Sequence, residues 1–273
     1  MCPTPLGNLE DITLRVLRVL REVPVVAAED TRRTRILLEH YGVRTRVLSF
    51  AQHNEEQRLG RLLALLHSGQ DVALVSDAGT PGIADPGFSL VSRCWAEGVP
   101  VVSLPGPTAL VTALVASGLP CDQFLFVGYL PRRAAARRRL LEQLAGEMRT
   151  LVCYEAPHRL ARSLRDVQEV FGNRMMFLAR ELTKLHEELL RGTVEEVCRS
   201  LGSAPVRGEL VLVLAGAAAR PPGPSETAES PDGSPTARAR QLSRREGISR
   251  SEAYRRVLEQ KKGTPQGSPT QKS

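Results

Sequence analysis

Short apolar runs of strand length alternate with amphipathic stretches over the first 215 residues, and this alternation constrains the fold more than any other feature. It is typical of α/β architecture, in which helices connect the strands of a sheet. Several runs are apolar throughout, which indicates strands that are covered on both faces. The predicted strands span residues 25–28, 47–50, 72–76, 101–104, 124–127, 151–154, 176–179 and 209–215. The predicted helices include residues 13–21, 32–41, 57–67, 89–97 and 108–117.

The pattern restarts at the turn Ser117-Gly118-Leu119-Pro120. We therefore expect an N-terminal α/β lobe over residues 1–118 and a C-terminal α/β lobe over residues 119–217. Pro, Ser and Gly dominate residues 218–236, which predicts a disordered linker. Residues 237–262 form a small basic helical segment, where Ser249 and Glu252 fit the start of a helix. Residues 263–273 are expected to form a disordered tail.

The net charge of +7 favours an anionic partner, with nucleic acid first and an acidic membrane surface second. A composition that simply prefers Arg to Lys is the alternative explanation. No apolar run approaches the ~20 residues of a membrane helix, and no signal peptide is evident. The five cysteines form no C-x-x-C pair, so neither a metal site nor a disulfide framework is expected. We expect a cytoplasmic protein that does not enter a membrane.

The loop Ser76-Asp77-Ala78-Gly79-Thr80-Pro81-Gly82 follows an apolar strand, at the sheet edge where open α/β sheets place ligands. Its glycines allow close approach of a ligand to the backbone, and its prolines stiffen it. Such a loop suits a flat adenosine, with Asp77 free to accept a hydrogen bond. A second loop, Pro105-Gly106-Pro107-Thr108, leads into a helix whose free N–H groups could hold a carboxylate. Neither a G-x-G-x-x-G fingerprint nor a P-loop is present.

Two arginine clusters are candidates for binding RNA phosphates, which guanidinium groups recognise with paired hydrogen bonds. One begins a helix beside two acidic residues, and the other follows Pro131. In each case the alternative is a solvated helix surface. The candidate RNA-binding residues are Arg32, Arg33 and Arg35 in the first cluster, and Arg132, Arg133, Arg137, Arg138 and Arg139 in the second.

Charged residues also follow two predicted strands of the C-terminal lobe, where they could project into one cleft. Glu155 follows the strand at 151–154, and Glu181 and Lys184 follow the strand at 176–179. A hydroxyl is a weak nucleophile that profits from a positioned base. Glu155, Glu181 and Lys184 are therefore candidate catalytic residues, and surface charge beside a helix start is the alternative.

The order of these motifs resembles the ribosomal RNA small subunit methyltransferase I family of 16S rRNA cytidine-2′-O-methyltransferases, within the tetrapyrrole-methylase superfamily. The motifs are Pro-Thr-Pro-Leu-Gly-Asn-Leu-Glu-Asp-Ile-Thr at 3–13, Ala-Glu-Asp-Thr-Arg-Arg-Thr at 28–34, Ser-Asp-Ala-Gly-Thr-Pro-Gly-Ile-Ala-Asp-Pro-Gly at 76–87, Pro-Gly-Pro-Thr-Ala at 105–109 and Ala-Arg-Glu-Leu-Thr-Lys at 179–184. The resemblance covers residues 3–216 and a C-terminal helical segment. In that family an apolar strand precedes the Pro-Thr-Pro turn, whereas only Met1 and Cys2 precede it here, so either the start is misassigned or the sheet lacks a strand.

The resemblance implies a two-lobed class III methyltransferase fold rather than a classical Rossmann fold, with S-adenosyl-L-methionine held between the lobes of a homodimer. It implies that the cofactor contacts Leu6, Asp77, Gly79, Thr80, Gly82, Thr108, Ala109, Tyr154, Ala179 and Gly208. The expected activity is 2′-O-ribose methylation of a decoding-centre cytidine in 16S rRNA, on the free RNA or on the small ribosomal subunit. A precorrin or other small-molecule methyltransferase and a non-catalytic rRNA-binding assembly protein are the alternatives.

Overall fold

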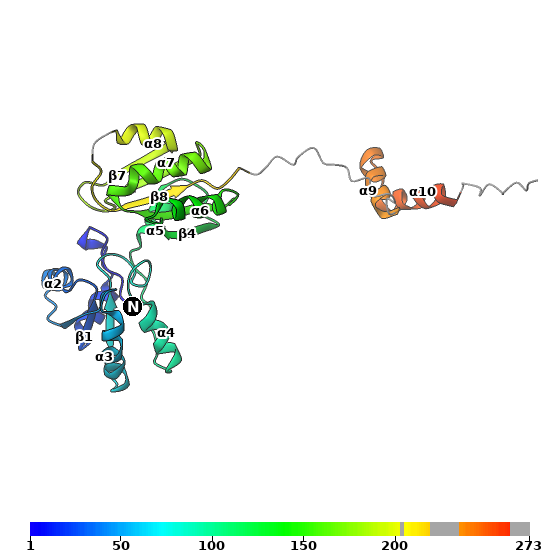
Figure 1. Cartoon of the computed structure of the whole chain (residues 1–273). Coiled ribbons are helices and arrows are strands. Elements are labelled where there is room, and N and C mark those ends of the chain that lie inside the picture. The colour runs from blue at the N-terminus through cyan, green and yellow to red at the C-terminus, as the bar shows by residue number, and fades with distance from the viewer. Residues whose placement is uncertain (203–204, 219–234, 263–273) are drawn as a thin grey trace, which may run out of the picture. The chain divides into compact units, whose positions relative to one another are not determined.

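A computed structural model describes residues 1–202, 205–218 and 235–262 of the chain. The chain divides into two compact units, Met1–Ala219 and Arg220–Ser273, which are described separately. Most of the predicted linker at 218–236 and all of the predicted tail at 263–273 lie outside the described residues. Figure 1 shows that the first unit contains two sheets, each with its own helices.

The N-terminal sheet has three parallel strands in the order β2-β1-β3. Its strands are β1 (Val25–Ala28), β2 (Arg46–Ser49) and β3 (Val72–Val75). The surrounding helices are the 3-10 helix η1 (Leu9–Asp11) and the α-helices α1 (Leu14–Glu22), α2 (Thr31–His40), α3 (Glu55–His67) and α4 (Phe88–Ala96). Thr13 caps α1 and Asp30 caps α2 through their side chains, which each accept a hydrogen bond from a backbone N–H of the first turn. The predicted strands and helices between residues 13 and 97 are confirmed to within two residues at each end.

The predicted strand at 101–104 is wrong, because this segment pairs with no strand among the described residues. It instead hydrogen-bonds to the first residue of the chain. The Met1 ammonium donates to the Val102 carbonyl at 2.8 Å, and the Leu104 N–H donates to the Met1 carbonyl at 3.0 Å. On the other side the Cys2 N–H donates to the Leu74 carbonyl at 2.9 Å. Met1 and Cys2 thus bridge β3 and segment 101–104, but two residues are too few for a ladder.

The C-terminal sheet is mixed, with strand order β4-β5-β8-β6-β7. Only β4 and β5 are parallel, and the other neighbours are antiparallel. Its strands are β4 (Phe124–Tyr129), β5 (Thr150–Glu155), β6 (Met175–Arg180), β7 (Glu188–Thr193) and β8 (Leu210–Leu214). Its helices are α5 (Ala109–Ala116), α6 (Ala134–Leu144), the 3-10 helix η2 (Pro157–Arg159), α7 (Leu160–Phe171) and α8 (Val194–Leu201). The sequence prediction missed β7, an edge strand whose exposed positions obscure its apolar pattern.

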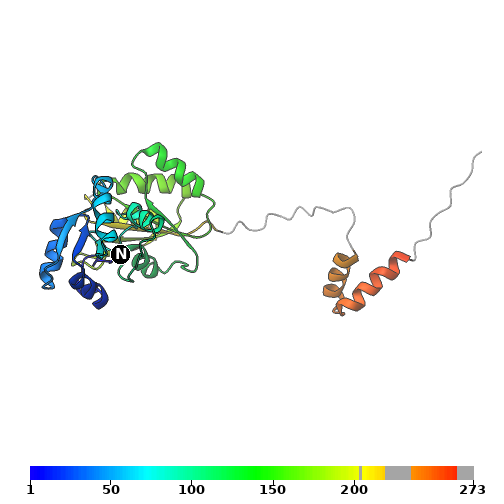
Figure 2. The same ribbon diagram turned by 90° about the horizontal axis from the view of Figure 1, so that it is seen from below.

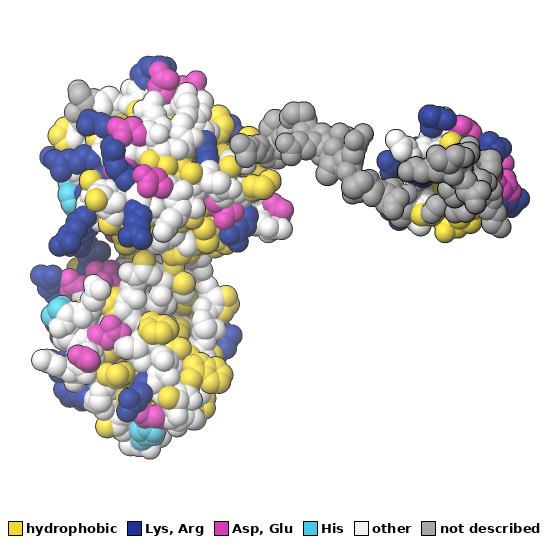
Figure 3. Space-filling model, turned by 45° about the vertical axis from the view of Figure 1, so that its right-hand side comes forward, with side chains coloured by type: hydrophobic (Ala, Val, Ile, Leu, Met, Phe, Trp, Pro, Cys, Tyr) yellow, Lys and Arg dark blue, Asp and Glu magenta, His cyan; other side chains and the backbone are white. Residues whose placement is uncertain are grey.

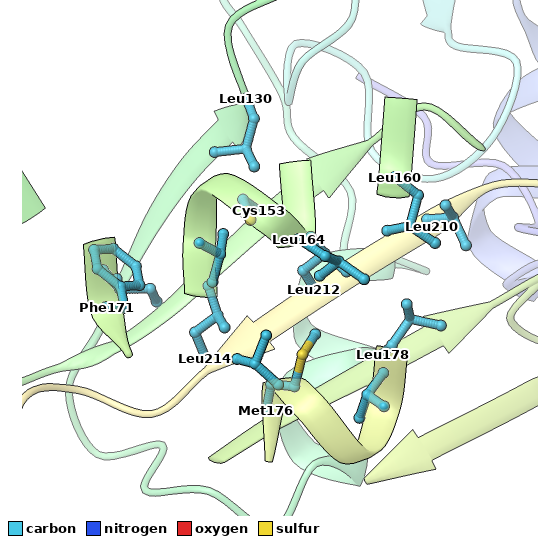
Figure 4. Close-up of a cluster of buried hydrophobic side chains, with 14 of the residues drawn as sticks. Leu130, Cys153, Leu160, Leu164, Phe171, Met176, Leu178, Leu210, Leu212 and Leu214 are labelled. Atoms are coloured by element: carbon cyan, nitrogen blue, oxygen red, sulfur yellow. The ribbon is translucent and has the colours of Figure 1, made fainter. Parts of the chain in front are cut away.

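The largest core cluster lies between this sheet and the helices packed on it (Figure 4). Leu212 in the central strand β8 is fully buried against Leu164 of α7 and Leu178 of β6. A second cluster packs α5 on the opposite face of the same sheet, through Leu114 and Phe177. Because both faces are covered, β8 reads as the continuous apolar run Leu-Val-Leu-Val-Leu. This rigid sheet fixes the ends of β4, β5 and β8.

The second unit contributes two helices, α9 (Pro235–Glu246) and α10 (Arg250–Lys262), joined by a tight bend (Figure 2). Gly247, with a φ of 65°, makes the bend possible because this backbone region favours glycine. Ser249 accepts a hydrogen bond from the Glu252 N–H at 3.3 Å, which confirms the predicted start of the second helix. The buried side chains of Ala239 and Ala253 let the two helices pack closely. The unit is a helical hairpin.

Candidate functional site

A cavity of about 320 Å³ lies in the first unit, at the carboxyl ends of strands from both sheets. Glu29 follows β1, the loop at 76–87 follows β3, and Tyr129 and Glu155 end β4 and β5. The volume is within the range of small-molecule sites, and the lining mixes apolar surface with a few charged groups. The lining residues are Leu6, Glu29, Arg33, Asp77, Ala78, Gly79, Thr80, Ile83, Ala84, Asp85, Thr108, Ala109, Tyr129, Tyr154, Glu155, Ala156, Pro157, Leu182, Gly208, Glu209, Leu210 and Val211.

The structure brings eight of the ten expected cofactor-binding residues to this cavity. The two others lie away from its lining. Ala179 is fully buried within β6, and Gly82 lies close to Met1. The residues that line the cavity are Leu6, Asp77, Gly79, Thr80, Thr108, Ala109, Tyr154 and Gly208.

The loop after β3 is held in place by the N-terminal turn. Thr4 and Gly79 exchange two backbone hydrogen bonds of 2.9 Å, and the Thr4 hydroxyl donates to the Ser76 carbonyl at 3.0 Å. Gly79 has a φ of 79°, and a Cβ there would lie 3.2 Å from the Leu6 side chain. A glycine is therefore required for both the turn and the close approach of the two segments.

Asp77 links this loop to the start of α2. Its carboxylate accepts a hydrogen bond from the Asp30 N–H at 2.9 Å and lies 3.6 Å from the Arg33 guanidinium. The neighbouring Glu29 accepts from the Asp77 N–H at 3.4 Å. Burial, together with the charge of Asp77, raises the pKa of Glu29 above its ordinary value. The N-terminal wall of the cavity is therefore acidic.

Thr80 and Thr108 join the loop to α5. The Thr80 hydroxyl donates to the Pro107 carbonyl at 3.0 Å, just before the helix begins at Ala109. Thr108 is the N-cap residue of α5, but its side chain makes no capping hydrogen bond. Thr108 and Ala109 line the cavity together with Tyr154. The start of α5 thus faces the cavity across from a tyrosine.

Two tyrosines form the C-terminal wall of the cavity. The rings of Tyr129 and Tyr154 lie 5.5 Å apart between centroids and are inclined by 64°. Burial raises the pKa of Tyr154 to about 12, so the phenol stays protonated. With Leu182 and Val211 these rings offer apolar surface to a flat ligand. Tyr129 is not among the site residues predicted from the sequence, although its place at the end of an apolar strand and shortly before Pro131 is a local signal that could have identified it.

Glu155, one of the candidate catalytic residues, lines the cavity but is held by partners. Its side chain is 0% exposed. The carboxylate accepts hydrogen bonds from the Ala156 N–H at 2.6 Å and from the Ser163 hydroxyl, and it forms an ion pair with Arg159. A buried carboxylate with so many partners is held in one position.

Glu181 and Lys184 form a separate cluster that does not line the cavity. The Lys184 ammonium lies 2.7 Å from Glu181 and 3.2 Å from Glu209. Burial alone would raise the pKa of Glu181, but the hydrogen bond from Lys184 brings it below its ordinary value. Burial would likewise lower the pKa of Lys184, but Glu181 and Glu209 bring it above its ordinary value. This cluster contacts the N-terminal turn, where a Cβ on Gly7 would overlap the Lys184 side chain.

The candidate RNA-binding arginines have different environments. Arg32 pairs with Asp30 at 2.7 Å, and Arg33 lines the cavity beside Asp77. Arg137 is only 4% exposed and donates to Asp166 at 2.7 Å, and Arg138 donates to the same carboxylate at 2.8 Å. Every member of the two clusters except Arg137 is exposed. The exposed members that form no ion pair among the described residues are Arg35, Arg132, Arg133 and Arg139.

Residues 2–198 match the family described as Tetrapyrrole (Corrin/Porphyrin) Methylases. The chain is also similar to proteins named ribosomal RNA small subunit methyltransferase I. It is 49% identical to the one from Thermotoga maritima over 213 residues (78% of this chain, 96% of that protein), and 50% identical to the one from Pseudomonas aeruginosa over 216 residues (78% and 77%). The protein of that name from Micromonospora olivasterospora is 51% identical over 217 residues (79% and 69%).

Solved structures show the same fold. The methyltransferase CobJ superposes with a TM-score of 0.59 at 21% identity, covering 82% of this chain and 95% of that chain. The cobalt precorrin-4 methyltransferase CbiF gives a TM-score of 0.57 at 19% identity, covering 78% and 92%. The predicted two-lobed tetrapyrrole-methylase fold is confirmed. Within the described residues, no helix is both long enough and apolar enough to span a membrane.

Proposed function

The chain belongs to the tetrapyrrole (corrin/porphyrin) methylase family, and from that premise we propose that it is an S-adenosylmethionine-dependent methyltransferase of ribosomal RNA. Its substrate is the 2′-hydroxyl of a cytidine in the decoding centre of 16S rRNA, in the free RNA or the small subunit. The observation that carries the proposal is the cavity between the two sheets, in a chain about half identical to relatives whose names state rRNA methylation.

The cavity fits S-adenosylmethionine in both shape and chemistry. Gly79 leaves room for close backbone approach, Tyr129 and Tyr154 offer flat surface, and the cavity is acidic through Glu29, Asp77 and neighbouring carboxylates. An acidic site of this kind suits a ligand that carries a positive charge. When bound, S-adenosylmethionine supplies an electrophilic methyl group on a sulfonium ion.

The residues of the chain position this ligand and exclude water. We propose that Asp77 accepts a hydrogen bond from it, that the N–H groups at the start of α5 face its carboxylate, and that Tyr154 contacts its adenine. Because methyl transfer is an in-line displacement, most of the rate gain comes from holding the two reactants in line. The remaining proposed contacts are the residues expected from the resemblance that line the cavity, at Leu6, Gly79, Thr80, Thr108, Ala109 and Gly208. Gly82 and Ala179, also expected from the resemblance, lie away from this lining.

Glu155, Glu181 and Lys184 are proposed as positioning residues, since each already has charged partners. Glu155 fixes the end of β5, and the Glu181–Lys184 pair fixes the loop against the N-terminal turn. Substitution of each by Gln or Met and measurement of tritiated methyl incorporation into small subunits tests this role. A positioning residue changes KM and thermal stability along with kcat. A change of kcat alone would instead indicate direct chemistry.

RNA binding is proposed for the exposed arginines. Arg35, Arg132, Arg133 and Arg139 can reach phosphates, whereas Arg137 has no free surface to offer. Arg32, Arg33 and Arg138 each pair with an aspartate, but their charges can still contribute to the positive electrostatic potential that attracts RNA. Substitution of Arg133 and Arg139 by Ser together is expected to weaken RNA binding several-fold and to reduce its salt dependence.

The helical hairpin is proposed as an auxiliary RNA contact, because it holds most of the excess positive charge. Residues 235–262 contain 9 Lys+Arg against 3 Asp+Glu, whereas residues 1–219 contain 26 against 24. Nearly neutral surfaces gain little from counterion release, so a strongly basic element is expected to dominate the salt-dependent part of RNA affinity. We further propose that the chain comprises an N-terminal lobe at residues 1–118, a C-terminal lobe at residues 119–217 and a linker before the hairpin.

We also propose that the protein is a cytoplasmic homodimer. In support, large apolar side chains are exposed on two helices: Phe88 (80% exposed) and Trp95 (73%) on α4, and Val115 on α5. Figure 3 shows hydrophobic side chains gathered on this side of the first unit. Exposed apolar groups of this size are typical of association surfaces. Light scattering during gel filtration tests the state, and Trp95→Glu is expected to shift it to monomer.

The decisive experiment combines calorimetry with mapping of the RNA product. Titration with S-adenosylmethionine tests the cavity, and a protein that only assists ribosome assembly would not bind it. Small subunits or free 16S rRNA are then incubated with protein and donor, and mass spectrometry of the RNA locates the new methyl group. Donor binding without RNA methylation, together with transfer to a corrin, would identify a small-molecule methyltransferase instead.

A further inference from the structure

Two of the sequence motifs meet beside the cavity and enclose a second, smaller pocket, the turn pocket. The N-terminal turn at 3–13 forms one side of it, and helix α2, which contains the end of the motif at 28–34, forms the other. The volume of the turn pocket is about 140 Å³. Its lining residues are Thr4, Pro5, Gly7, Leu9, Arg33, Thr34, Ile36, Leu37, Ser76 and Asp77.

The turn pocket and the cavity share a wall. Arg33 and Asp77 line both, and the other residues of the turn pocket do not line the cavity. In a nucleotide the base and the 2′-hydroxyl are attached to neighbouring carbons of one sugar ring. A ribose whose 2′-hydroxyl enters the cavity therefore has its base within reach of the turn pocket.

The rim of the turn pocket is apolar. Arg33, Ile36 and Leu37 share one face of α2, because residues three and four apart in a helix lie side by side. Ile36 on this face is 68% exposed, and Leu9 on the N-terminal turn is 37% exposed. The Tyr41 hydroxyl donates to the Leu9 carbonyl and so holds this part of the turn against α2. Apolar side chains from two opposite elements can contact the two faces of a flat ring.

Arg33 is the hydrogen-bond donor that the turn pocket can offer to a ligand. The hydroxyl groups of Thr4 and Ser76 are buried and already donate to backbone carbonyls, at 3.0 and 3.3 Å. The Arg33 guanidinium lies 3.6 Å from the Asp77 carboxylate, which is longer than a hydrogen bond, and its side chain is 61% exposed. Its N–H groups can therefore donate to a ligand in the pocket while the charge stays near Asp77.

The size and charge of the turn pocket fit a single pyrimidine ring. A cavity of about 150 Å³ can hold benzene, a ring of similar size, whereas the two fused rings of a purine need more space. One cation and one anion line the pocket, Arg33 and Asp77, so their charges balance. The larger cavity is acidic by comparison. A neutral base therefore suits the turn pocket better than a phosphate does.

We propose that the turn pocket holds the pyrimidine base of the nucleotide that is methylated, and that Arg33 reads its Watson–Crick edge. The proposal rests on the proposed function and adds to it the site that selects the base. In cytosine the neighbouring O2 and N3 atoms both accept, so two N–H groups of one guanidinium can donate to them together. In uracil N3 carries a hydrogen, which faces the donor and weakens the contact. The base reaches the pocket only after it leaves the RNA stack, and Leu9 and Ile36 then replace its stacked neighbours.

The kinetic test uses 16S rRNA with either cytidine or uridine at the methylated position, free or reconstituted into small subunits, in single turnover. Wild type is expected to methylate the cytidine RNA about tenfold faster or more. Arg33→Lys keeps the charge but lacks the fork of donors, so it is expected to bind RNA within about twofold of wild type and to lower this preference to about threefold or less.

Ile36 tests the apolar rim independently of the hydrogen bonds. Ile36→Ser is expected to weaken RNA binding by about fivefold and to leave the Kd for S-adenosylmethionine within about twofold, since Ile36 does not line the cavity. Ile36→Leu keeps the apolar surface and is expected to behave as wild type. Arg61→Gln removes an exposed charge on α3 that does not line the turn pocket, and is the matched control for the loss of charge.

A second readout needs no methyl transfer. RNA with 5-fluorocytidine at the methylated position is bound to the protein together with S-adenosylhomocysteine, and fluorine magnetic resonance reports the surroundings of the base. Wild type is expected to shift the resonance away from that of unbound RNA, because apolar side chains replace the stacked neighbours of the base. Ile36→Ser is expected to return the resonance towards the unbound position, and Ile36→Leu to keep the shift.

The outcomes separate the two proposals. If wild type does not bind S-adenosylmethionine or does not methylate RNA, the proposed function fails. If wild type does both but methylates cytidine and uridine RNA equally, or if Arg33→Lys keeps the full preference, Arg33 does not read the base. An unchanged RNA affinity and an unchanged fluorine resonance in Ile36→Ser would show that the base lies elsewhere.

Discussion

Replacing Arg137 by Ala should destabilise the protein strongly and leave RNA binding almost unchanged. Its guanidinium lies 2.5 Å from Asp166, with side chains that are 4% and 6% exposed, and it donates to the Pro131 carbonyl at 3.2 Å. Removing one partner of a buried ion pair costs about 3–5 kcal/mol, because it leaves the other charge uncompensated. Arg138 still contacts Asp166 at 2.8 Å, so we expect the lower end of that range, about 3 kcal/mol.

Urea unfolding followed by circular dichroism measures this change, and filter binding to a 16S rRNA fragment measures the affinity of the folded variant. Arg139→Ala is the matched control, because Arg139 is exposed on the same helix. It should change stability by less than about 0.5 kcal/mol and weaken RNA binding. A loss of less than about 1 kcal/mol for Arg137→Ala, or a larger RNA effect than for Arg139→Ala, would refute the reasoning.

Three further results are expected. Gly79→Ala should weaken S-adenosylmethionine binding by tenfold or more in calorimetry, since the new Cβ meets Leu6 at a φ of 79°, whereas Gly146→Ala has no neighbour within 4 Å and should have no effect. Substituting three hairpin arginines by Glu (R238E, R240E and R244E) should flatten the salt dependence of RNA binding but leave S-adenosylmethionine affinity within twofold; an unchanged slope would exclude the hairpin as a contact. Asp85→Asn should match wild type in stability near pH 4 and exceed it by about 1–2 kcal/mol at pH 8. The folded-state pKa of Asp85 is raised to about 7, so wild type loses stability as pH rises from about 4 to 7. Partial exposure of the carboxyl group reduces the size of this loss. Parallel curves of unfolding free energy against pH for the two proteins would contradict this prediction.

Elements with a strong local pattern could be predicted from the sequence, and elements that depend on distant partners could not. The strand predicted at residues 25–28 matches the observed bounds of β1, because its apolar run is buried on both faces of the sheet. Segment 101–104 has the same apolar character, but a strand also needs a neighbouring strand. Within the part of the chain that the structure describes, its backbone hydrogen bonds go to Met1. The edge strand β7 exists because it pairs with β6, and its own residues carry little signal.

The same distinction applies to the site. The loop around Asp77 and the start of α5 could be predicted, because Gly and Pro restrict or permit particular backbone conformations and Thr often begins a helix. These preferences depend only on the residues themselves. The partner of Arg137 is Asp166, 29 residues further along the chain. The sequence therefore predicted Arg137 as part of a phosphate-binding cluster, whereas in the fold its guanidinium pairs with a carboxylate that only tertiary packing brings near. Asp85 is one of many acidic residues in the sequence. Only burial beside Glu29, Asp77 and Glu209 gives it a pKa near neutrality.

The distribution of charge implies a division of labour between the cavity and the rest of the protein. The cavity holds Glu29, Asp77, Asp85 and Glu209, which attract a sulfonium ion and repel a phosphodiester. The reacting nucleotide must therefore be brought there by contacts outside the cavity, and the exposed arginines and the basic hairpin are the groups available among the described residues. Added salt should then weaken RNA binding steeply, because it competes with those contacts. The partly enclosed cavity is screened less, so affinity for S-adenosylmethionine should fall only slightly over the same range.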